Sequence, residues 1–528
     1  GGGTVAGGFL IQRNLTPVVE EQLSDFLNRP VELGSLQSFS LNHVRFGKTD
    51  LLTTPHDPAK VSMSALKIAY NPIKYIIAGK LEIEVTAIEP SAYLEQGKQG
   101  NWLLTKFKTL NPNNPIKFKS LGFENAQAII VSRSNNGEKK QGINLNKLSG
   151  KIELISNNNK LKFQVKSNVV DGGIFQVSGV ADTENKAVNL LVRGHQLKGV
   201  EISQILPLPL DIETGKIDAN LEVSWQDNQL PQLQGVARLN QVSARVPAFP
   251  HPFQTQGQLR FKGTKIKLDE VITQFGEVTG IVNGDLDLDK GFNLTAKTQP
   301  TSITNIFTTI KQKPVNIAVS GPVQGDLKVT GSLENPNVSI SLNNTDLMKI
   351  DRINFRHIKT SLQLNKSYIK INYFQAVPTV GGKLTGKGNI DLNPSSPLFT
   401  IDIEGKNIPT ASLTSLYKTD IPNNIGQVST NINLSGNIKK PETFKAIGKA
   451  NFQVAGGTIK AEHITYVNGN WQGNIIASAI NLNSLDLPIK EGELQGQFQV
   501  AGNINNSTID SLKATGQGKI KVDNGSII

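Results

Sequence analysis

The sequence predicts a mostly-β protein: an elongated antiparallel sheet curled into an open groove, built from repeats, with an N-terminal amphipathic helix and short helices between repeats. Two observations predict this fold. Apolar and polar residues alternate over most of the chain after residue 120, and glycine-led β-runs return with a period of about 105 residues. Because successive side chains of a strand point to opposite faces, each alternating run gives one apolar and one polar face.

The glycine-led runs occur in two phases that keep nearly the same period. Copied units extend a surface more often than they build one catalytic pocket. A chain of 528 residues built in this way need not divide into compact domains of about 150 residues. The runs of the two phases start at Gly173, Gly276 and Gly382, and at Gly215, Gly325 and Gly426.

Three segments are expected along the chain. Residues 1–12 carry no charged residue and are a candidate for the end of a membrane anchor, with a flexible glycine-rich terminus as the alternative. Residues 13–110 are expected to form an α+β head. Residues 111–528 hold the repeating β-groove units, and the chain ends inside a β-run, as expected of a sequence truncated at its C-terminus.

The head begins with an expected amphipathic helix over residues 16–28. Thr16 is a candidate cap, Pro17 suits the first helical position, and Pro30 follows the helix. Its apolar face is expected to consist of Val19, Leu23, Phe26 and Leu27. A strand is expected at residues 81–85, with turns at Asn71-Pro72 and Glu89-Pro90 and a boundary loop at residues 111–115.

The repeats are expected to contain hairpin-like antiparallel strands, interrupted once per period by short apolar segments at residues 202–206, 303–310 and 411–416. Each segment is long enough for one or two helical turns. Isolated glycines within strands are expected to mark bulges or curvature. These glycines are Gly179, Gly331, Gly388, Gly436 and Gly502.

The apolar face of the sheet has to be shielded from water. A closed sandwich or barrel usually uses large side chains, and aromatic residues are only 6% of this sequence. An open groove would expose a long apolar surface unless something apolar, such as acyl chains, normally occupies it. The residues expected to line the groove are Leu161, Phe163, Val165, Ile217, Leu221, Val223, Leu327, Val329, Val428, Ile432, Leu434, Leu494, Phe498 and Val500.

Other classes of site have little support. The net charge of +12 is spread thinly, without the aromatic-interleaved basic runs of single-strand nucleic-acid grooves, so no nucleic-acid partner is expected. No cysteine is present, and the six histidines are scattered. The segment Gly284–Gly291 resembles the start of a calcium loop but lacks the acid at position twelve, where Ala296 stands. No catalytic residue, metal or cofactor is expected.

Several motifs in the head and repeats resemble those of the TamB and AsmA-like family, particularly cyanobacterial TamB and its chloroplast-envelope relatives. In the head they are Arg29–Gly34, Pro90, Tyr93–Glu95 and Gly100–Trp102. In the repeats, the stretches 426–459 and 492–527 resemble the family's glycine-rich strand pattern. The resemblance implies a single-pass inner-membrane anchor and a periplasmic β-groove shaped like a folded taco. It also implies a C-terminal end that docks on an Omp85-type outer-membrane barrel.

We therefore expect a non-enzymatic bridge that carries phospholipid along an apolar groove toward the outer membrane, or supports outer-membrane protein assembly. The body would lie in the periplasm or the equivalent chloroplast-envelope space. One alternative is a scaffold that adds substrate strands to a sheet edge during protein translocation, without lipid transport. Another is a β-rich surface protein or adhesin whose apolar faces close on one another.

Overall fold

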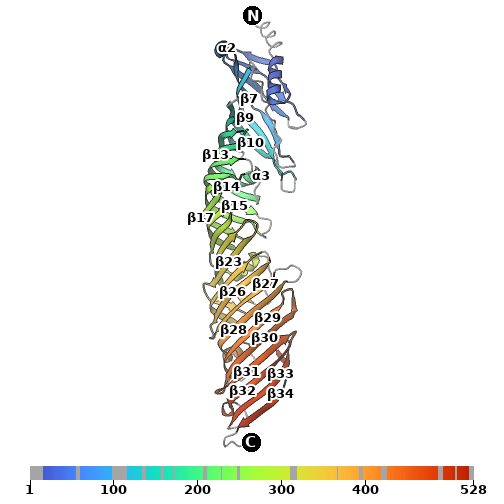
Figure 1. The fold of residues 1–528 in the computed structure, drawn as a ribbon, viewed down its shortest axis with the longest axis vertical. Coiled ribbons are helices and arrows are strands. Elements are labelled where there is room, and N and C mark those ends of the chain that lie inside the picture. The colour runs from blue at the N-terminus through green and yellow to red at the C-terminus, as the bar shows by residue number, and fades with distance from the viewer. Residues whose placement is uncertain are drawn as a thin grey trace. The chain divides into compact units, whose positions relative to one another are not determined.

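A computed structural model of the chain is shown in Figure 1. Strands account for 74% of the structure and helices for 9%, which confirms the predicted mostly-β class. The structure describes residues 16–54, 60–97, 116–133, 138–155, 160–169, 173–182, 184–205, 211–226, 229–245, 250–309, 318–365, 367–391, 397–417, 425–485, 492–505 and 508–521. The expected anchor segment at residues 1–12 and the boundary loop at residues 111–115 lie outside the described residues.

The chain divides into two compact units. Unit 1 comprises Gly1–Thr273 and Asp285–Asp289, and unit 2 comprises Gln274–Gly284 and Lys290–Ile528. The division falls within strands β17 (Lys265–Phe275) and β18 (Val278–Asp287). Each unit is therefore described by itself.

Unit 1 begins with the head, in which most strands are short. The strands of the head are β1 (Val31–Glu32), β2 (Leu36–Phe39), β3 (His43–Phe46), β4 (Thr49–Leu51), β5 (Val61–Met63), β6 (Ala65–Tyr70), β7 (Leu81–Ile88) and β8 (Ser91–Glu95), and β9 (Ile116–Val131) is the first strand after the head. β9 pairs in parallel with β7 and β8, and antiparallel with β10 (Ile143–Ile155). The expectation of antiparallel neighbours is wrong for the two parallel pairs, because the long connection between Glu95 and Ile116 lets the chain return in the same direction.

The head sheet bends where β7 passes into β8. Glu89, between these strands, has a φ of 48°, and Asn125 of β9 has a φ of 55°. The backbone N–H of Glu89 donates to the carbonyl of Glu124 over 2.8 Å, and Asn125 Nδ2 donates to Glu89 Oε1 over 3.4 Å. Glu89 after β7 and Asn125 in β9 therefore lie side by side, and the backbone has a left-handed conformation at both residues.

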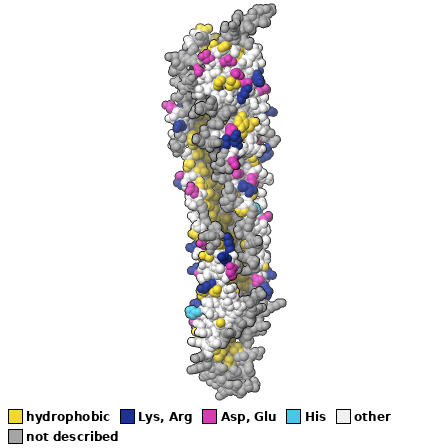
Figure 2. All heavy atoms as spheres, turned by 90° about the vertical axis from the view of Figure 1, so that its right-hand side faces the viewer, with side chains coloured by type: hydrophobic (Ala, Val, Ile, Leu, Met, Phe, Trp, Pro, Cys, Tyr) yellow, Lys and Arg dark blue, Asp and Glu magenta, His cyan; other side chains and the backbone are white. Residues whose placement is uncertain are grey.

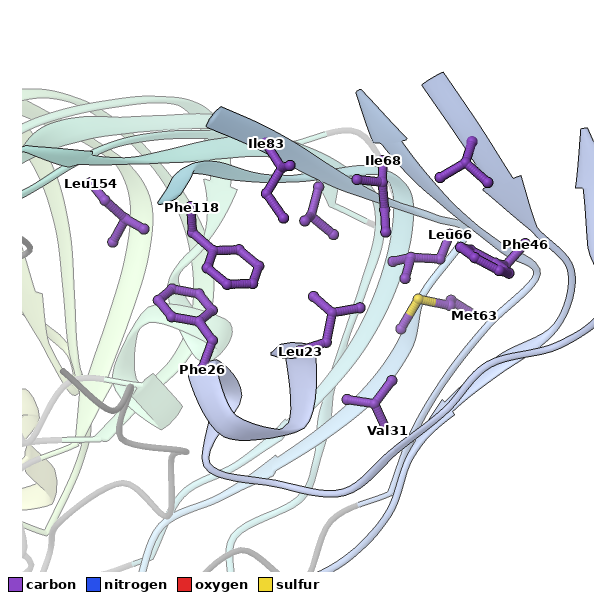
Figure 3. Close-up of a cluster of buried hydrophobic side chains, with 12 residues drawn as sticks. Leu23, Phe26, Val31, Phe46, Met63, Leu66, Ile68, Ile83, Phe118 and Leu154 are labelled. Carbon is purple, nitrogen blue, oxygen red and sulfur yellow. The ribbon is translucent and has the colours of Figure 1, made fainter. Parts of the chain in front are cut away.

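The N-terminal helix covers residues 16–27 and packs its apolar side into the head core. Leu23 and Phe26 are 2% and 0% exposed, and Val19 and Leu27 pack against the same cluster. The Phe26 ring stacks on that of Phe118 in β9 with centroids 4.1 Å apart (Figure 3). All four residues expected on the apolar side of the helix therefore contribute to one core.

The Asn71-Pro72 step begins a helix, α2 (Pro72–Ala78), where a turn was expected. Asn71 Oδ1 accepts the backbone N–H of Lys74 over 3.1 Å, which is the geometry of a helix N-cap. Pro72 occupies the first helical position, where its missing N–H costs nothing. An Asn-Pro step is therefore equally compatible with a turn and with a capped helix start.

The rest of unit 1 is a succession of longer antiparallel strands. Each strand from β9 to β15 pairs with the next along the chain. Between β13 and β14 lies α3 (Gly199–Ile205), which overlaps the apolar segment expected at residues 202–206. The strands after β10 are β11 (Lys160–Val169), β12 (Ile174–Asp182), β13 (Ala187–Lys198), β14 (Asp211–Gln226), β15 (Gln232–Arg245), β16 (Phe253–Gly263) and β17.

Unit 2 also consists of antiparallel strands after β18, but several of them pair with a strand that is not the next along the chain. Helices α4 (Ile303–Thr309) and α5 (Thr410–Tyr417) fall on the two remaining apolar segments, and a single 3-10 turn, η1 (Leu482–Ser484), follows β32. The strands after β18 are β19 (Gly291–Thr298), β20 (Thr301–Ser302), β21 (Val319–Ser320), β22 (Pro322–Gly331), β23 (Pro336–Asn344), β24 (Met348–Ile350), β25 (Ile353–Leu364), β26 (Tyr368–Pro378), β27 (Lys383–Asp391), β28 (Leu398–Pro409), β29 (Ile425–Asn437), β30 (Lys440–Val454), β31 (Gly457–Val467), β32 (Asn470–Asn481), β33 (Glu493–Asn505) and β34 (Thr508–Lys521).

Candidate functional site

In unit 1 the strand register places the predicted lining residues on one face of the sheet. Directly opposed residues of an antiparallel pair share a face. One such row runs from β10 to β15, and a second row lies two residues away along each strand, on the same face. Both rows consist of apolar residues and glycines without a polar interruption. The rows are Ile152, Phe163, Gly179, Leu190, Val223 and Leu233, and Gly150, Val165, Val177, Val192, Leu221 and Gly235.

Unit 2 has an apolar face of the same kind. Leu327, Val329, Ile432 and Leu434 join rows that cross it, and Leu494, Phe498 and Val500 share the β33 face of Gly502, where one row ends. Two rows are Val329, Val338, Leu364, Ile369, Ile390, Phe399 and Gly436, and Leu327, Ile340, Leu362, Ile371, Gly388, Ile401, Leu434, Ala446, Tyr466, Trp471 and Gly502.

Most side chains of these apolar faces are half-buried rather than fully buried. Of the fourteen predicted lining residues, only Ile217, Val428 and Val500 are buried, at 8%, 9% and 9% exposed, and the others are half-buried. On the surface of unit 1, Figure 2 shows hydrophobic side chains gathered along a hollowed strip. An apolar surface in this state can accept an apolar ligand without unpacking a core.

Bulges at non-glycine residues turn additional apolar side chains to this face. In β15 the pairing shifts between Leu239 and Val242, and Gln241 has a φ of 50°. Simple alternation from Leu239 would put Gln241 on the apolar face, but the bulge puts Val242 there, and it is 3% exposed. The same pattern, a residue with positive φ followed by a buried apolar residue, occurs at Lys147-Leu148, Glu270-Val271, Asn407-Ile408 and Ala479-Ile480.

These buried residues were not predicted, although the sequence holds a signal for them. Each follows an apolar or glycine position by three residues instead of two, as in Leu145 and Leu148 or Leu268 and Val271. The expectation that glycines mark the bulges holds at Gly436, which lies at a register shift. The pairings of Gly179 and Gly502 are continuous, so these two glycines mark no bulge. Gly388 borders the register shift in the pairing of β26 with β27.

A side chain of the next strand can satisfy the backbone N–H of a bulge residue. The N–H of Gln196 donates to Asp218 Oδ1 over 2.7 Å, and that of Asn407 donates to Ser429 Oγ over 3.1 Å. The first hydrogen bond, with His195 Nδ1 at 2.8 Å, lowers the pKa of Asp218. Polar residues of the outer face thus hold the bulges in place.

The glycines of the apolar face make room for neighbouring rings. A Cβ atom on Gly386 would lie 2.2 Å from Cε1 of Phe374 and 2.4 Å from the carbonyl oxygen of Asp402. At Gly436 the rings of Phe399 and Phe444 meet edge to face with centroids 5.0 Å apart, and a Cβ would lie 2.7 Å from Phe444 Cδ1. The absence of a Cβ atom at these glycines therefore leaves room for the neighbouring rings.

The apolar face closes into a core at particular places. In the head, Leu154 and Leu161 belong to the cluster of Phe26 and Phe118, so the open face of unit 1 is continuous with a closed core. Near α3, Ile202 packs on a cluster that includes Ile212, Ile217, Ala237 and Val242. In unit 2 a comparable cluster contains Val454, Ala477 and Ile480, with Phe498 and Leu494 packed against it.

The polar face carries cross-strand charge pairs. A hollow of about 920 Å³ in unit 2 includes Lys387, Asp402, Glu404 and Lys449 in its lining. In unit 1, Glu84 lies 2.7 Å from Lys119 Nζ and 3.1 Å from Lys151 Nζ, and these lysines lower its pKa to about 2. Such pairs are what a solvated sheet face is expected to carry.

Other kinds of site find no support among the described residues. Within these ranges no group of three or more histidine, cysteine or acidic side chains could hold a metal ion. In the calcium-like segment, Asp287 Oδ1 instead accepts from Thr264 Oγ1 over 2.9 Å and from the N–H of Asp289 over 3.0 Å. Of the helices in the described part of the chain, none has both the length and the apolarity to cross a membrane.

Comparison of this chain with protein-family models, with curated proteins and with solved structures finds no match. The apolar face of each unit is therefore interpreted from its own residues.

Proposed function

We propose that this chain is a non-enzymatic lipid conduit of the TamB and AsmA-like kind, in which the apolar sheet faces form the floor of an open groove for phospholipid acyl chains. The observation that carries the proposal is the set of uninterrupted rows of opposed apolar residues and glycines that remain half-exposed. The bulges that bend the strands and the short helices at strand ends support a curved, open floor.

Lipid can move along such a floor only if its free energy changes little from one position to the next. Each methylene group removed from water contributes about 0.8 kcal/mol, so a gap in the apolar lining would be a barrier. The rows of each unit contain no charged side chain, whereas charged residues such as Lys162, Lys166 and Glu222 occupy the opposite face. Polar headgroups would stay at the open mouth, in water.

The same rows argue against a closed sandwich or adhesin-like body. In a packed core, opposed apolar side chains are almost fully buried. Here Phe163, Leu221, Val329 and Ile432 are only half-buried. Acyl chains are the cover that best fits a surface offering apolar contact without specific polar groups.

The membrane contacts belong to the same proposal. An inner-membrane anchor would precede the described helix at residues 16–27, and the body would lie in the periplasm or the chloroplast-envelope space. An Omp85-type barrel would receive the conduit through a C-terminal part beyond residue 528. These contacts rest on the family resemblance of the head and repeat motifs.

The test is site-specific photo-crosslinking combined with mass spectrometry of co-purified lipids. A crosslinker at Phe498, which is half-buried on the apolar face, is compared with one at Gln497, its exposed neighbour on the polar face. Lipid adducts at position 498 and not at 497 are expected. Absence of lipid, or equal adducts at both positions, would refute the conduit.

Two other functions are outcomes of the same experiment. Peptide adducts at strand edges without lipid adducts at Phe498 would identify a scaffold that adds strands to a sheet during outer-membrane protein assembly. Absence of both kinds of adduct would favour a closed β-rich surface protein. Either result would replace the conduit proposal.

A further inference from the structure

Helix α2 presents three isoleucine side chains to solvent. Ile73, Ile76 and Ile77 are 67%, 82% and 80% exposed. Residues three and four apart in a helix share one face, so the three isoleucines form a single apolar patch. A short helix on a sheet normally turns such a face toward the core, and α2 does the opposite.

The helix is fixed in this orientation. Asn71 caps its start, and Gly79, with a φ of 67°, follows its last residue. Just before it, Tyr70 donates through its N–H to the carbonyl of Asn42 over 2.9 Å and through its hydroxyl to the carbonyl of Ser40 over 2.7 Å. These bonds hold the turn between β2 and β3 beside the start of α2.

That turn adds a fourth apolar side chain. Leu41, at its tip, is 86% exposed. The nearby strands β6 and β7 already supply Ile68 and Ile83 to the head core, at 4% and 7% exposed. The core is thus complete without the isoleucines, so the patch of Ile73, Ile76, Ile77 and Leu41 faces outward.

The charge around the patch favours an anionic membrane surface. From Pro58 to Leu81 the chain contains four lysines and no acidic residue. Lys74 Nζ lies 3.2 Å from Glu82, the next acid along the chain, and its side chain is 59% exposed. Aliphatic side chains flanked by lysines are typical of elements that insert shallowly at a bilayer interface.

We propose that the α2 patch is a bilayer contact, inserted among the headgroups of an anionic membrane and distinct from the acyl-chain floor of the groove. α2 lies at the same end of unit 1 as the helix at residues 16–27 (Figure 1). An anchor that precedes that helix would therefore bring the patch to the membrane surface. The inference adds a second attachment site to the proposed function, and its test does not depend on lipid transport.

The full 528-residue chain contains no cysteine, so a single introduced thiol reports one position. Ile76→Cys is labelled with an environment-sensitive nitrobenzoxadiazole dye and mixed with vesicles of phosphatidylethanolamine and phosphatidylglycerol. The matched control is Ile272→Cys, because Ile272 is 48% exposed on β17 of the same unit. We expect the fluorescence to rise at least twofold and to shift to the blue at position 76 but not at position 272.

A second variant tests the contribution of the patch to binding. Ile73→Ser, Ile76→Ser and Ile77→Ser together should lower vesicle association about tenfold, whereas Leu347→Ser, at a 52% exposed position of unit 2, should not. These side chains are exposed, so the fold is expected to persist, which circular dichroism checks. An unchanged dye spectrum at position 76 would overturn the proposal even if residues 1–12 bind vesicles, and it would leave a protein partner as the cover of the patch. Crosslinking at Phe498 reports the groove separately.

Discussion

The backbone N–H of Gln196 donates to Oδ1 of Asp218 over 2.7 Å, so a carboxylate of β14 satisfies a donor that the bulge in β13 removes from the ladder. His195 Nδ1 lies 2.8 Å from the same oxygen, and Asn240 Nδ2 donates to Asp218 Oδ2 over 3.3 Å. The bulge is therefore held by a charged acceptor rather than by strand pairing alone.

Asp218→Ala should loosen this bulge. A hydrogen bond to a charged group contributes about 1.5–3 kcal/mol, and partial exposure of Asp218 places the loss at the lower end. We expect amide exchange of β13 and β14 to accelerate about tenfold at neutral pH, measured by hydrogen-exchange mass spectrometry. Asp218→Asn, which keeps an acceptor oxygen, should have a smaller effect.

Because this acceptor is a carboxylate, the amide exchange of β13 and β14 should depend on pH. Because the pKa of Asp218 is lowered from its ordinary value of 3.8, its contribution is complete above that value and is lost as the pH falls through the folded pKa. Exchange in the unsubstituted protein should therefore approach that of Asp218→Asn only below about pH 3.8. A difference between the two proteins that stays constant from pH 7 to pH 3 would contradict this explanation.

Glu84 should make a smaller contribution to stability, which also depends on pH. Lys119 and Lys151 lower its pKa to about 2, so its contribution is present above its ordinary pKa and fades as the pH falls toward 2. Its side chain is 35% exposed, and solvent screening limits such pairs to about 1 kcal/mol or less. The control is Glu222→Gln, a substitution elsewhere on the polar face. The urea midpoint of Glu84→Gln should be slightly below that of Glu222→Gln at pH 7, and the difference between the two variants should be smaller at pH 3.

Phe26 should be essential for the head. Its ring is 0% exposed and stacks on Phe118 at an interplanar angle of 7°. Phe26→Ala should destabilise the head by about 3–5 kcal/mol through lost burial and a residual cavity. Limited proteolysis should then cleave residues 16–54 faster, whereas Val18→Ala, at a 49% exposed position of the same helix, should leave the rate unchanged.

Gly386→Ala tests the fit of rings beside glycines on the apolar face. The new Cβ would meet the Phe374 ring and the Asp402 carbonyl, and overpacking of this kind costs about 1–3 kcal/mol. The melting temperature of unit 2 should fall. Gly426→Ala is the control, because the nearest atom to its Cβ would be the Gln453 carbonyl oxygen at 3.3 Å. Equal melting temperatures for both variants would rule out the steric explanation.

Leu221→Asp places a carboxylate on the proposed floor, where it would interrupt the apolar row of Val165, Val177 and Val192. Lipid transfer in a reconstituted assay between donor and acceptor vesicles should stop or fall at least tenfold. Asn220→Asp adds the same charge on the polar face opposite Arg193 and should leave transfer unchanged. Transfer that survives Leu221→Asp in a folded protein would show that the floor is not the path.

Alternation in the sequence determined which residues form strands and which face each side chain occupies over most of the chain. Period two is a local property, so Phe163, Leu221 and Ile432 could be assigned to the apolar side before any strand was paired. The helical residues Val19, Leu23, Phe26 and Leu27 were identifiable for the same reason, from the period of a helix.

Other features of the fold depend on how the strands pair. Whether β9 lies parallel to β7, whether Asn71-Pro72 starts a helix, and where a bulge turns Val242 inward all depend on contacts between segments distant in the sequence. A bulge reverses the facing of every residue beyond it, so local alternation misassigns those positions until the neighbouring strand fixes the register. Local alternation is therefore enough to predict two unlike faces, whereas nonlocal strand pairing sets where the apolar face bends, closes into a core or stays open.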